Sequence, residues 1–125
     1  MAQIQKQREA DGATTVLLVT GKVIAEEIVA AIEDFYRQEC TRNLIWDLTR
    51  ADLTELTMAQ LRQILSFAQG YKHLREKGKT AIVTASDLGF GLGRMYEILC
   101  ELDNHPIPLK VFKAMPEARD WLAGP

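Results

Sequence analysis

The spacing of apolar residues along the chain separates short runs typical of strands from longer stretches with helical periodicity. Residues 3–20 predict two strands around Asp11-Gly12, because an Asp-Gly pair readily adopts the positive φ angles of a tight turn. The first strand is polar and is expected at a sheet edge. The second, residues 14–19, is a β-branched run typical of a buried strand, and it ends at Gly21.

The next stretch, residues 22–40, predicts an amphipathic helix that covers a sheet. Its apolar residues recur three and four positions apart and share one helix face: Ile24, Ile28, Ala31, Ile32 and Phe35. Residues 43–48 form a compact apolar run that predicts a central strand, and residues 49–56 are expected to be a loop.

Thr57 stands at the N-cap position of a second helix, which is expected to run to about Glu76 with Gly78 at its end. A strand at 80–85 follows, and then a helix that is capped by Ser86-Asp87 and extends through Leu102. A last strand at 108–112 and a short helix from Pro116 to about 122–123 complete the chain, in the order ββαβαβαβα.

This order predicts a single α/β domain over residues 1–125, with a mixed sheet of about five strands. Strands separated by helices of this length cannot form hairpins, so the later strands are expected to lie parallel, with right-handed crossovers. The N-terminal pair forms a hairpin, and the helices cover the sheet. The length of 125 residues and the apolar fraction of 47% fit one hydrophobic core.

The charge balance bears on the partners of the chain. A net charge of −2 gives no overall positive field for phosphate backbones, so nucleic-acid binding is not expected. One stretch of the chain is basic and is interpreted as a solvated helix end: Lys72, His73, Arg75, Lys77 and Lys79.

Cellular location is inferred from apolar runs and cysteines. No apolar run is long enough to span a membrane and residues 1–6 contain no hydrophobic signal core, so a cytoplasmic protein is expected. Cys40 and Cys100 are far apart in the sequence and are expected to be reduced. Cys100 beside Leu99 is interpreted as small core filler rather than a nucleophile.

Three stretches at matching points of this element order resemble the SpoIIAA-like proteins, which include the bacterial STAS domains of anti-sigma-factor antagonists and uncharacterised relatives. They are residues 45–49, 86–95 and 111–122. The resemblance covers nearly the whole chain. It implies the SpoIIAA-like (STAS-like) fold and a role in binding a regulatory protein, and we expect a homodimer.

In the anti-sigma-factor antagonists, a serine at the start of the helix after the central strand is phosphorylated within an Asp-Ser-Ser-Gly-type motif. The motif is absent here, where the region reads Leu53-Thr54-Glu55-Leu56-Thr57-Met58. Thr57, and less well Thr54, are the candidate phosphoacceptors. A phosphate on an N-cap threonine faces the positive end of the helix, but an unmodified Thr57 is already explained as a cap that stabilises its helix.

The start of the third helix carries Gly89, Gly91 and Gly93, where backbone amides can approach an anion. Their spacing matches neither the dinucleotide fingerprint nor a phosphate loop, and close packing of small residues explains them as well. Phe90, Met95 and Tyr96 on this helix either line an apolar ligand cleft or belong to the ordinary core.

Asp47, Asp52 and Glu55 gather near the carboxyl end of the central strand, where open α/β sheets place their sites. Solvated loop charges are the simpler explanation, and we expect no metal, cofactor or catalytic residue.

The sequence therefore favours a non-enzymatic protein-interaction or regulatory module. Its expected partner surface includes Asp52, Glu55 and Met58 in one segment and residues 89–96 in the other. The first alternative is a small apolar-ligand or lipid-binding protein with a cleft under the helix at 88–102. A weaker alternative is an unrecognised enzyme centred on the acidic group.

Overall fold

The computed structural model describes residues 2–38, 40–75 and 77–124 of the chain. Within them, strands and helices follow the predicted order. The elements are β1 (Gln3–Arg8), β2 (Thr14–Lys22), α1 (Ala25–Arg37), β3 (Asn43–Asp52), α2 (Met58–Gln69), the 3₁₀ turn η1 (Lys72–Leu74), β4 (Thr80–Val83), α3 (Asp87–Leu102), β5 (Leu109–Phe112) and α4 (Met115–Ala123).

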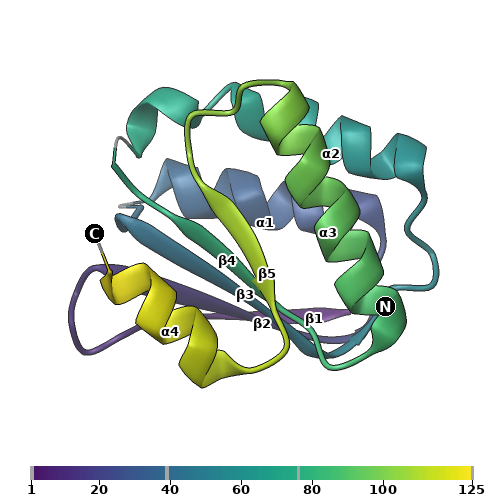
Figure 1. Ribbon diagram of the computed structural model, residues 1–125, viewed down its shortest axis with the longest axis horizontal. Coiled ribbons are helices and arrows are strands. Elements are labelled where there is room, and N and C mark those ends of the chain that lie inside the picture. The colour runs from purple at the N-terminus through teal and green to yellow at the C-terminus, as the bar shows by residue number, and fades with distance from the viewer. Residues whose placement is uncertain (1, 39, 76, 125) are drawn as a thin grey trace.

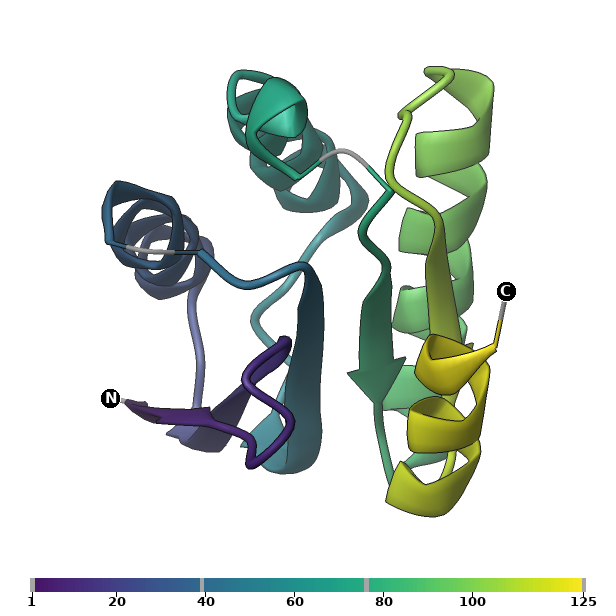
Figure 2. The same ribbon diagram turned by 90° about the vertical axis from the view of Figure 1, so that its left-hand side faces the viewer.

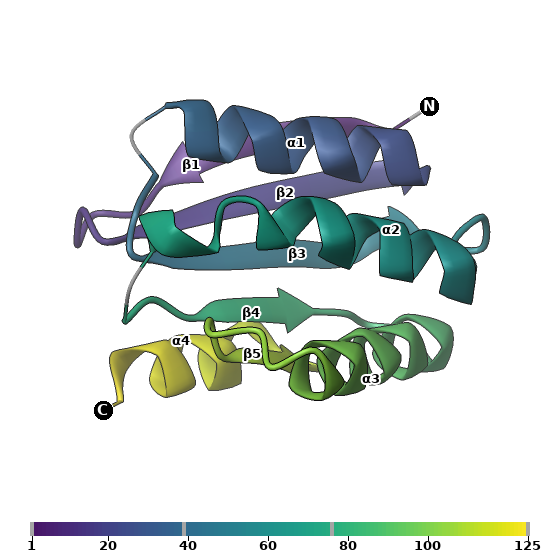
Figure 3. The same ribbon diagram turned by 90° about the horizontal axis from the view of Figure 1, so that it is seen from above.

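The strands form one mixed sheet in the order β1-β2-β3-β4-β5. β1 runs antiparallel to β2, and β2 to β5 are parallel. Because each crossover advances one strand in the same direction with the same hand, α1, α2 and α3 lie over the same face of the sheet. Figure 3 shows these three helices side by side, and Figure 1 shows α4 on the other side of the strands. The predicted fold class is confirmed.

Apolar side chains on the two faces of the sheet form two cores, as strand alternation requires. On the side of α1, α2 and α3, strand residues such as Leu17, Trp46 and Ile82 pack beneath the helices. On the side of α4, Ile45 and Phe112 pack against the short helix.

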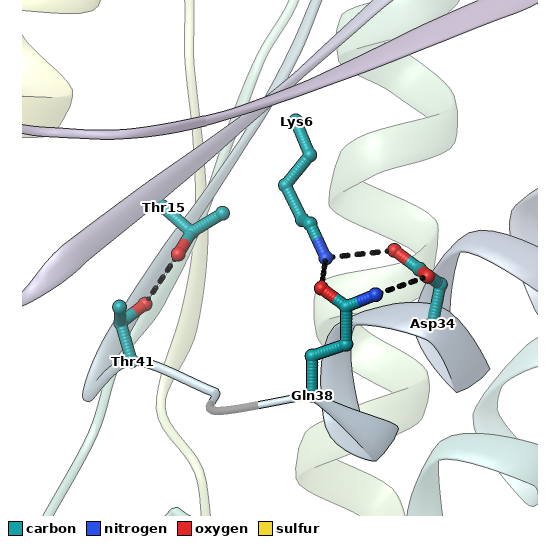
Figure 4. A network of polar contacts seen from close by, with 5 residues as sticks. All are labelled: Lys6, Thr15, Asp34, Gln38 and Thr41. Carbon is teal, nitrogen blue, oxygen red and sulfur yellow. Dashed lines mark hydrogen bonds and ion pairs between the residues drawn. The ribbon is translucent and has the colours of Figure 1, made fainter.

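The two sheet edges, seen on opposite sides of Figure 2, are protected differently. Lys6 of edge strand β1 reaches α1, where its Nζ lies 2.9 Å from Asp34 Oδ2 and 2.6 Å from Gln38 Oε1 (Figure 4). At the other edge α3 packs on β5, and Glu97 Oε2 accepts a hydrogen bond from the Val111 amide at 3.2 Å. Both devices discourage pairing with a further strand.

Two strands run further than predicted. β2 continues to Lys22 and β3 to Asp52, so residues 49–52 are strand rather than loop and α1 begins at Ala25 instead of residue 22. The ladder shifts register between Leu18 and Thr20 and then resumes, with Lys22 opposite Asp52. A local irregularity of this kind allows the two strands to continue pairing beyond it. The pattern of apolar residues does not reveal this continuation.

The second helix is shorter than predicted. It ends at Gln69, where the Gly70 amide donates to the Phe67 carbonyl at 3.2 Å, and η1 follows. Glu76, the expected end, lies outside the described residues. Gly78 is required for another reason: a Cβ atom there would lie 2.1 Å from the Arg42 carbonyl oxygen.

The remaining boundaries differ by one to three residues, the largest difference being the end of α1 at Arg37 instead of about residue 40. β4 ends at Val83, β5 begins at Leu109 and α4 begins at Met115. The hairpin turn at Asp11-Gly12 is confirmed, with a φ of 71° at Gly12.

Candidate docking edge and interhelical cavity

The parallel strands β2, β3 and β4 end at the same side of the sheet, so α1, α2 and α3 all begin there. We call this side, residues 22–26, 52–58 and 84–90, the carboxyl edge. Each of the three helix starts presents a large apolar side chain to solvent. The exposed fractions are 42% for Ile24, 39% for Met58 and 50% for Leu88.

The segment that leads into α2 is held by a polar turn. Asp52 Oδ1 accepts hydrogen bonds from the Thr54 hydroxyl at 2.6 Å and the Thr54 amide at 3.0 Å. The bond from the Thr54 hydroxyl is the main cause that lowers the pKa of the Asp52 carboxyl, which therefore stays ionised. Glu55 pairs with Lys22 at 3.5 Å, and the buried Leu53 fixes the turn to the core.

Thr57 is the N-cap of α2, as predicted. Its Oγ1 accepts a hydrogen bond from the Gln60 amide at 3.2 Å, and Gln60 Oε1 accepts one from the Thr57 amide at 3.0 Å. This reciprocal pair is a capping box. Thr57 is exposed, so its hydroxyl combines a structural role with access from solvent.

Ser86 is the predicted cap of α3, and its Oγ accepts a hydrogen bond from the Gly89 amide at 2.9 Å. Gly89 and Gly93 are buried, and a Cβ atom at Gly93 would lie 2.6 Å from Val111 Cγ2. Gly91 is exposed, with no atom within 4 Å of such a Cβ. Close packing therefore explains two of the three glycines.

The acidic residues near the end of β3 do not form one site. Asp47 Oδ1 accepts hydrogen bonds from the Thr49 hydroxyl at 2.7 Å and the Thr49 amide at 3.1 Å, while Asp52 and Glu55 have the separate partners given above. Within residues 2–38, 40–75 and 77–124, no group of three or more histidines, cysteines or carboxylates could hold a metal ion.

Of the two cysteines, Cys100 is buried and Cys40 is half-buried. Burial, with a smaller contribution from Asp103, raises the pKa of the Cys100 thiol to about 12. The thiol is therefore protonated at neutral pH and is a poor nucleophile.

An apolar cavity of about 100 Å³ lies between the sheet and α1, α2 and α3. Toward the carboxyl edge its wall includes Leu53, Leu56 and Gly89, and near the amino ends of the strands it includes polar residues. Those polar residues are Tyr36, Arg75, Thr80, Tyr96 and His105. The cavity is partly open to solvent.

Only part of the predicted cleft lining is found there. Tyr96 lines the cavity together with Gly89, Leu92 and Gly93, but Phe90 and Met95 do not. Residues 89, 92, 93 and 96 share one helix face, whereas 90 and 95 point elsewhere. Phe90 instead packs against Lys113, whose Nζ lies 5.0 Å from the ring centre.

Arg75 is the main residue whose role sequence reasoning missed. It belongs to the run interpreted as a solvated helix end, yet its side chain is only 3% exposed. Tyr36 of α1, which accepts a hydrogen bond from Arg75, also stacks on Tyr71, with ring centres 4.9 Å apart. No local pattern marks these residues, because their contacts join distant segments.

No protein-family model matches this chain, and no curated protein matches it in sequence. Several solved structures, however, have a similar fold. An anti-sigma-factor antagonist from Mycobacterium paratuberculosis superposes with a TM-score of 0.66 and 18% identity, over 99% of this chain and 96% of that one. This chain has the SpoIIAA-like fold.

Two further structures agree. An uncharacterised DUF3478 protein with a SpoIIAA-like fold from Shewanella loihica PV-4 gives a TM-score of 0.61 at 19% identity, over 98% of this chain and 94% of that one. The unphosphorylated anti-sigma-factor antagonist SpoIIAA gives 0.55 at 16% identity, over 98% of this chain and all of the other, 100%. None of the described helices is both long and apolar enough to cross a membrane.

Proposed function

We propose that this chain is a non-enzymatic protein-interaction module that binds a regulatory protein through its carboxyl edge. The observation that carries the proposal is the set of three exposed apolar side chains, Ile24, Met58 and Leu88, one at each helix start of that edge. Apolar groups rimmed by polar ones are typical of protein-binding surfaces. The SpoIIAA-like fold, shared with anti-sigma-factor antagonists, supports the same conclusion.

Substitutions in the edge test this proposal. Tagged wild-type protein, Met58→Asp and Leu88→Asp are compared by quantitative mass spectrometry of the proteins they retain from the native host. Leu102→Asp is the matched control, because Leu102 lies on the same helix as Leu88 at its far end and is 73% exposed. We expect a partner retained by wild type and Leu102→Asp and lost from both edge variants.

A set of retained proteins that is the same for all four forms would contradict docking at the carboxyl edge. Retention of nothing by wild type would count against the interaction module itself. Circular dichroism of each variant establishes that a lost partner is not the result of unfolding.

We further propose Thr57, rather than Thr54, as the phosphoacceptor that regulates this edge. A phosphate on Thr57 would face the amides of the first turn of α2. The Thr54 hydroxyl, in contrast, is bonded to the Asp52 carboxylate at 2.6 Å, so a phosphate there would meet a like charge.

Thr57→Glu places a negative charge at the cap, and we expect it to change the affinity for the retained partner at least tenfold. Thr57→Ala is the comparison, since it removes the cap without adding a charge. Equal affinities of wild type and Thr57→Glu, measured by calorimetry, would exclude the switch.

The homodimer and the cytoplasmic location expected from the sequence remain predictions. Native mass spectrometry of protein isolated from its own host measures the first and also detects bound phosphate or small molecules. A monomer at micromolar concentration would contradict the dimer.

A second candidate function is supported by one specific observation, the cavity beneath α2 and α3. A partly enclosed space of about 100 Å³ with a mainly apolar wall suits a small apolar ligand. Extraction of native protein with organic solvent, followed by mass spectrometry, tests for such a ligand.

A further inference from the structure

One end of the cavity contains a buried positive charge. Arg75 is 3% exposed, and no ion pair of this side chain is found in the part of the chain that the structure describes. A buried charge is costly unless it is paired or well hydrogen-bonded. The groups that accept its hydrogen bonds are neutral carbonyls and hydroxyls, so no carboxylate among these partners cancels the positive potential of the guanidinium.

The hydrogen bonds of Arg75 fall into two groups. Its Nε and Nη2 donate to main-chain carbonyls, those of Arg42 at 3.2 and 3.0 Å and of Lys79 at 2.6 Å. Its Nη1 donates to two hydroxyl oxygens, Tyr36 Oη at 3.2 Å and Thr80 Oγ1 at 2.9 Å. The first group joins chain segments, and the second points to residues of the cavity wall.

Both hydroxyl oxygens accept from Arg75, which leaves the proton of each hydroxyl available to donate. A hydroxyl that accepts a hydrogen bond still has its own proton to give, and no acceptor for either proton is found among the described residues. A donor that accepts from a cation is polarised, so it forms a stronger bond to the next acceptor. Tyr36 and Thr80 therefore place two polarised donors at the wall of an otherwise apolar space.

Tyr96 adds a third hydroxyl group to this wall. Burial raises the pKa of Tyr96 well above its ordinary value, with smaller contributions from Cys100 and Tyr36. The phenol is therefore protonated at all physiological pH values and available as a donor.

We propose that the cavity binds a small organic acid, with its apolar chain between α2 and α3 and its carboxylate against the hydroxyls of Tyr36 and Thr80 beside Arg75. A carboxylate has one negative charge and two acceptor oxygens, which match one cation and two donors. The proposal rests on the second candidate function above and names its ligand class. It does not depend on docking at the carboxyl edge.

The size of the cavity restricts the apolar part of the acid. An apolar cavity of about 150 Å³ holds a benzene-sized molecule. A space of about 100 Å³ therefore takes one short chain or a small ring, and a longer chain would extend through the open part of the cavity.

The experiment titrates the purified protein with butanoate, hexanoate, octanoate, decanoate and phenylacetate, each beside the alcohol of the same carbon skeleton. Calorimetry gives affinities, and methyl NMR spectra give the site. Isoleucine methyl groups that line the cavity should shift: Ile28, Ile32, Ile64 and Ile82. Ile45 and Ile107 are buried but do not line it and should stay unchanged.

We expect the best acid to bind about tenfold or more tightly than its alcohol, as charge-assisted hydrogen bonds require. Tyr36→Phe and Thr80→Val should each lower the affinity for the acid about tenfold and leave the affinity for the alcohol unchanged. The matched control is Tyr71→Phe, because Tyr71 stacks on Tyr36 without lining the cavity. Ala68→Phe, which fills the cavity from α2, should abolish binding of both probes.

The outcomes separate the two proposals. Equal affinities for acids and alcohols, with shifts confined to the cavity isoleucines, would overturn the proposal of an acid ligand. The proposal that the cavity binds an apolar ligand would stand. No shift of those methyl groups with any probe, or equal shifts of Ile45 and Ile107, would overturn both. Insensitivity to Tyr36→Phe in a variant that remains folded would overturn the role of the hydroxyls.

Discussion

At the carboxyl edge, α2 and α3 both begin at a hydroxyl N-cap, yet their first turns meet the rest of the protein differently. The start of α2 is closed by its own polar groups, Thr57 and Gln60, and Met58 remains exposed. The start of α3 has only Ser86 as a cap and gains its position from contact with the sheet.

Glycines make that contact. Without side chains at Gly89 and Gly93, the backbone of α3 approaches Thr84 and Val111 closely. The position of α3 is thus set by packing, whereas the start of α2 is set by hydrogen bonds that face solvent. The backbone of α3 is therefore fixed by the core, whereas the start of α2 depends on exposed polar side chains.

The largest effect should come from Gly93→Ala. The added Cβ would lie 2.6 Å from Val111 Cγ2, so α3 or Val111 must move. Overpacking costs about 1–3 kcal/mol, of which up to about 1 kcal/mol is offset by the higher helix propensity of alanine. Urea denaturation followed by circular dichroism should show a lower free energy of unfolding.

The matched control is Gly91→Ala on the same helix. Its Cβ would meet nothing within 4 Å, so it should raise the free energy of unfolding by about 0.5–1 kcal/mol. Changes of the same sign in both variants would contradict the packing account. Combining Gly93→Ala with Val111→Ala should relieve the overlap and give a favourable coupling energy.

Smaller effects are expected at the caps. Thr57→Ala and Ser86→Ala should each lower the free energy of unfolding by about 1 kcal/mol, because an amide of the first turn loses its acceptor. Gln60→Ala should also lower the free energy of unfolding, because it removes half of the capping box. The start of α3 has no equivalent contribution, since the corresponding residue is Gly89, which has no side chain. Thermal unfolding measures each change, with Thr57→Ser as the variant that keeps the cap.

An unchanged free energy of unfolding in Ser86→Ala would indicate that packing alone fixes the start of α3. That outcome would widen the difference between the two helices rather than remove it. If Gln60→Ala and a surface change such as Gln63→Ala lowered the stability equally, the capping box would not contribute to stability.

The sequence predicted these local features because their causes are local. Thr57 and Ser86 are caps of their own helices, and a hydroxyl at that position has the same use in most proteins. The element order and the fold follow from periodicity and from the rule for crossovers.

What the sequence did not reveal depends on distant contacts. Arg75 bonds Tyr36 across 39 positions and Arg42 across 33, so its charge was assigned to solvent although it lies in the core. Of the three residues predicted to line the cleft, only Tyr96 does so, and the reason is simpler. Phe90 and Met95 were chosen by residue type, whereas the helix phase that selects Tyr96 requires knowing which face of α3 meets the sheet.

The smallest effect concerns the polar turn before α2, which has no counterpart before α3. The Thr54 hydroxyl, followed by the Thr54 amide, lowers the pKa of the Asp52 carboxyl. A depressed pKa in the folded state stabilises the protein above the ordinary pKa of the carboxyl, and that contribution is lost as pH falls through the folded value. Thr54→Val should therefore raise the Asp52 pKa toward its ordinary value.

Carboxyl-carbon NMR titration measures this pKa in wild type and in Thr54→Val. The difference in stability between the two proteins should be present at neutral pH and vanish once Asp52 is protonated in both. Asp11 is the internal control, because the pKa of its carboxyl is lowered chiefly by the Ala13 amide and should not respond. An unchanged Asp52 pKa in Thr54→Val would mean that the amide alone holds the turn, and the start of α2 would then rest on its backbone more than on side chains.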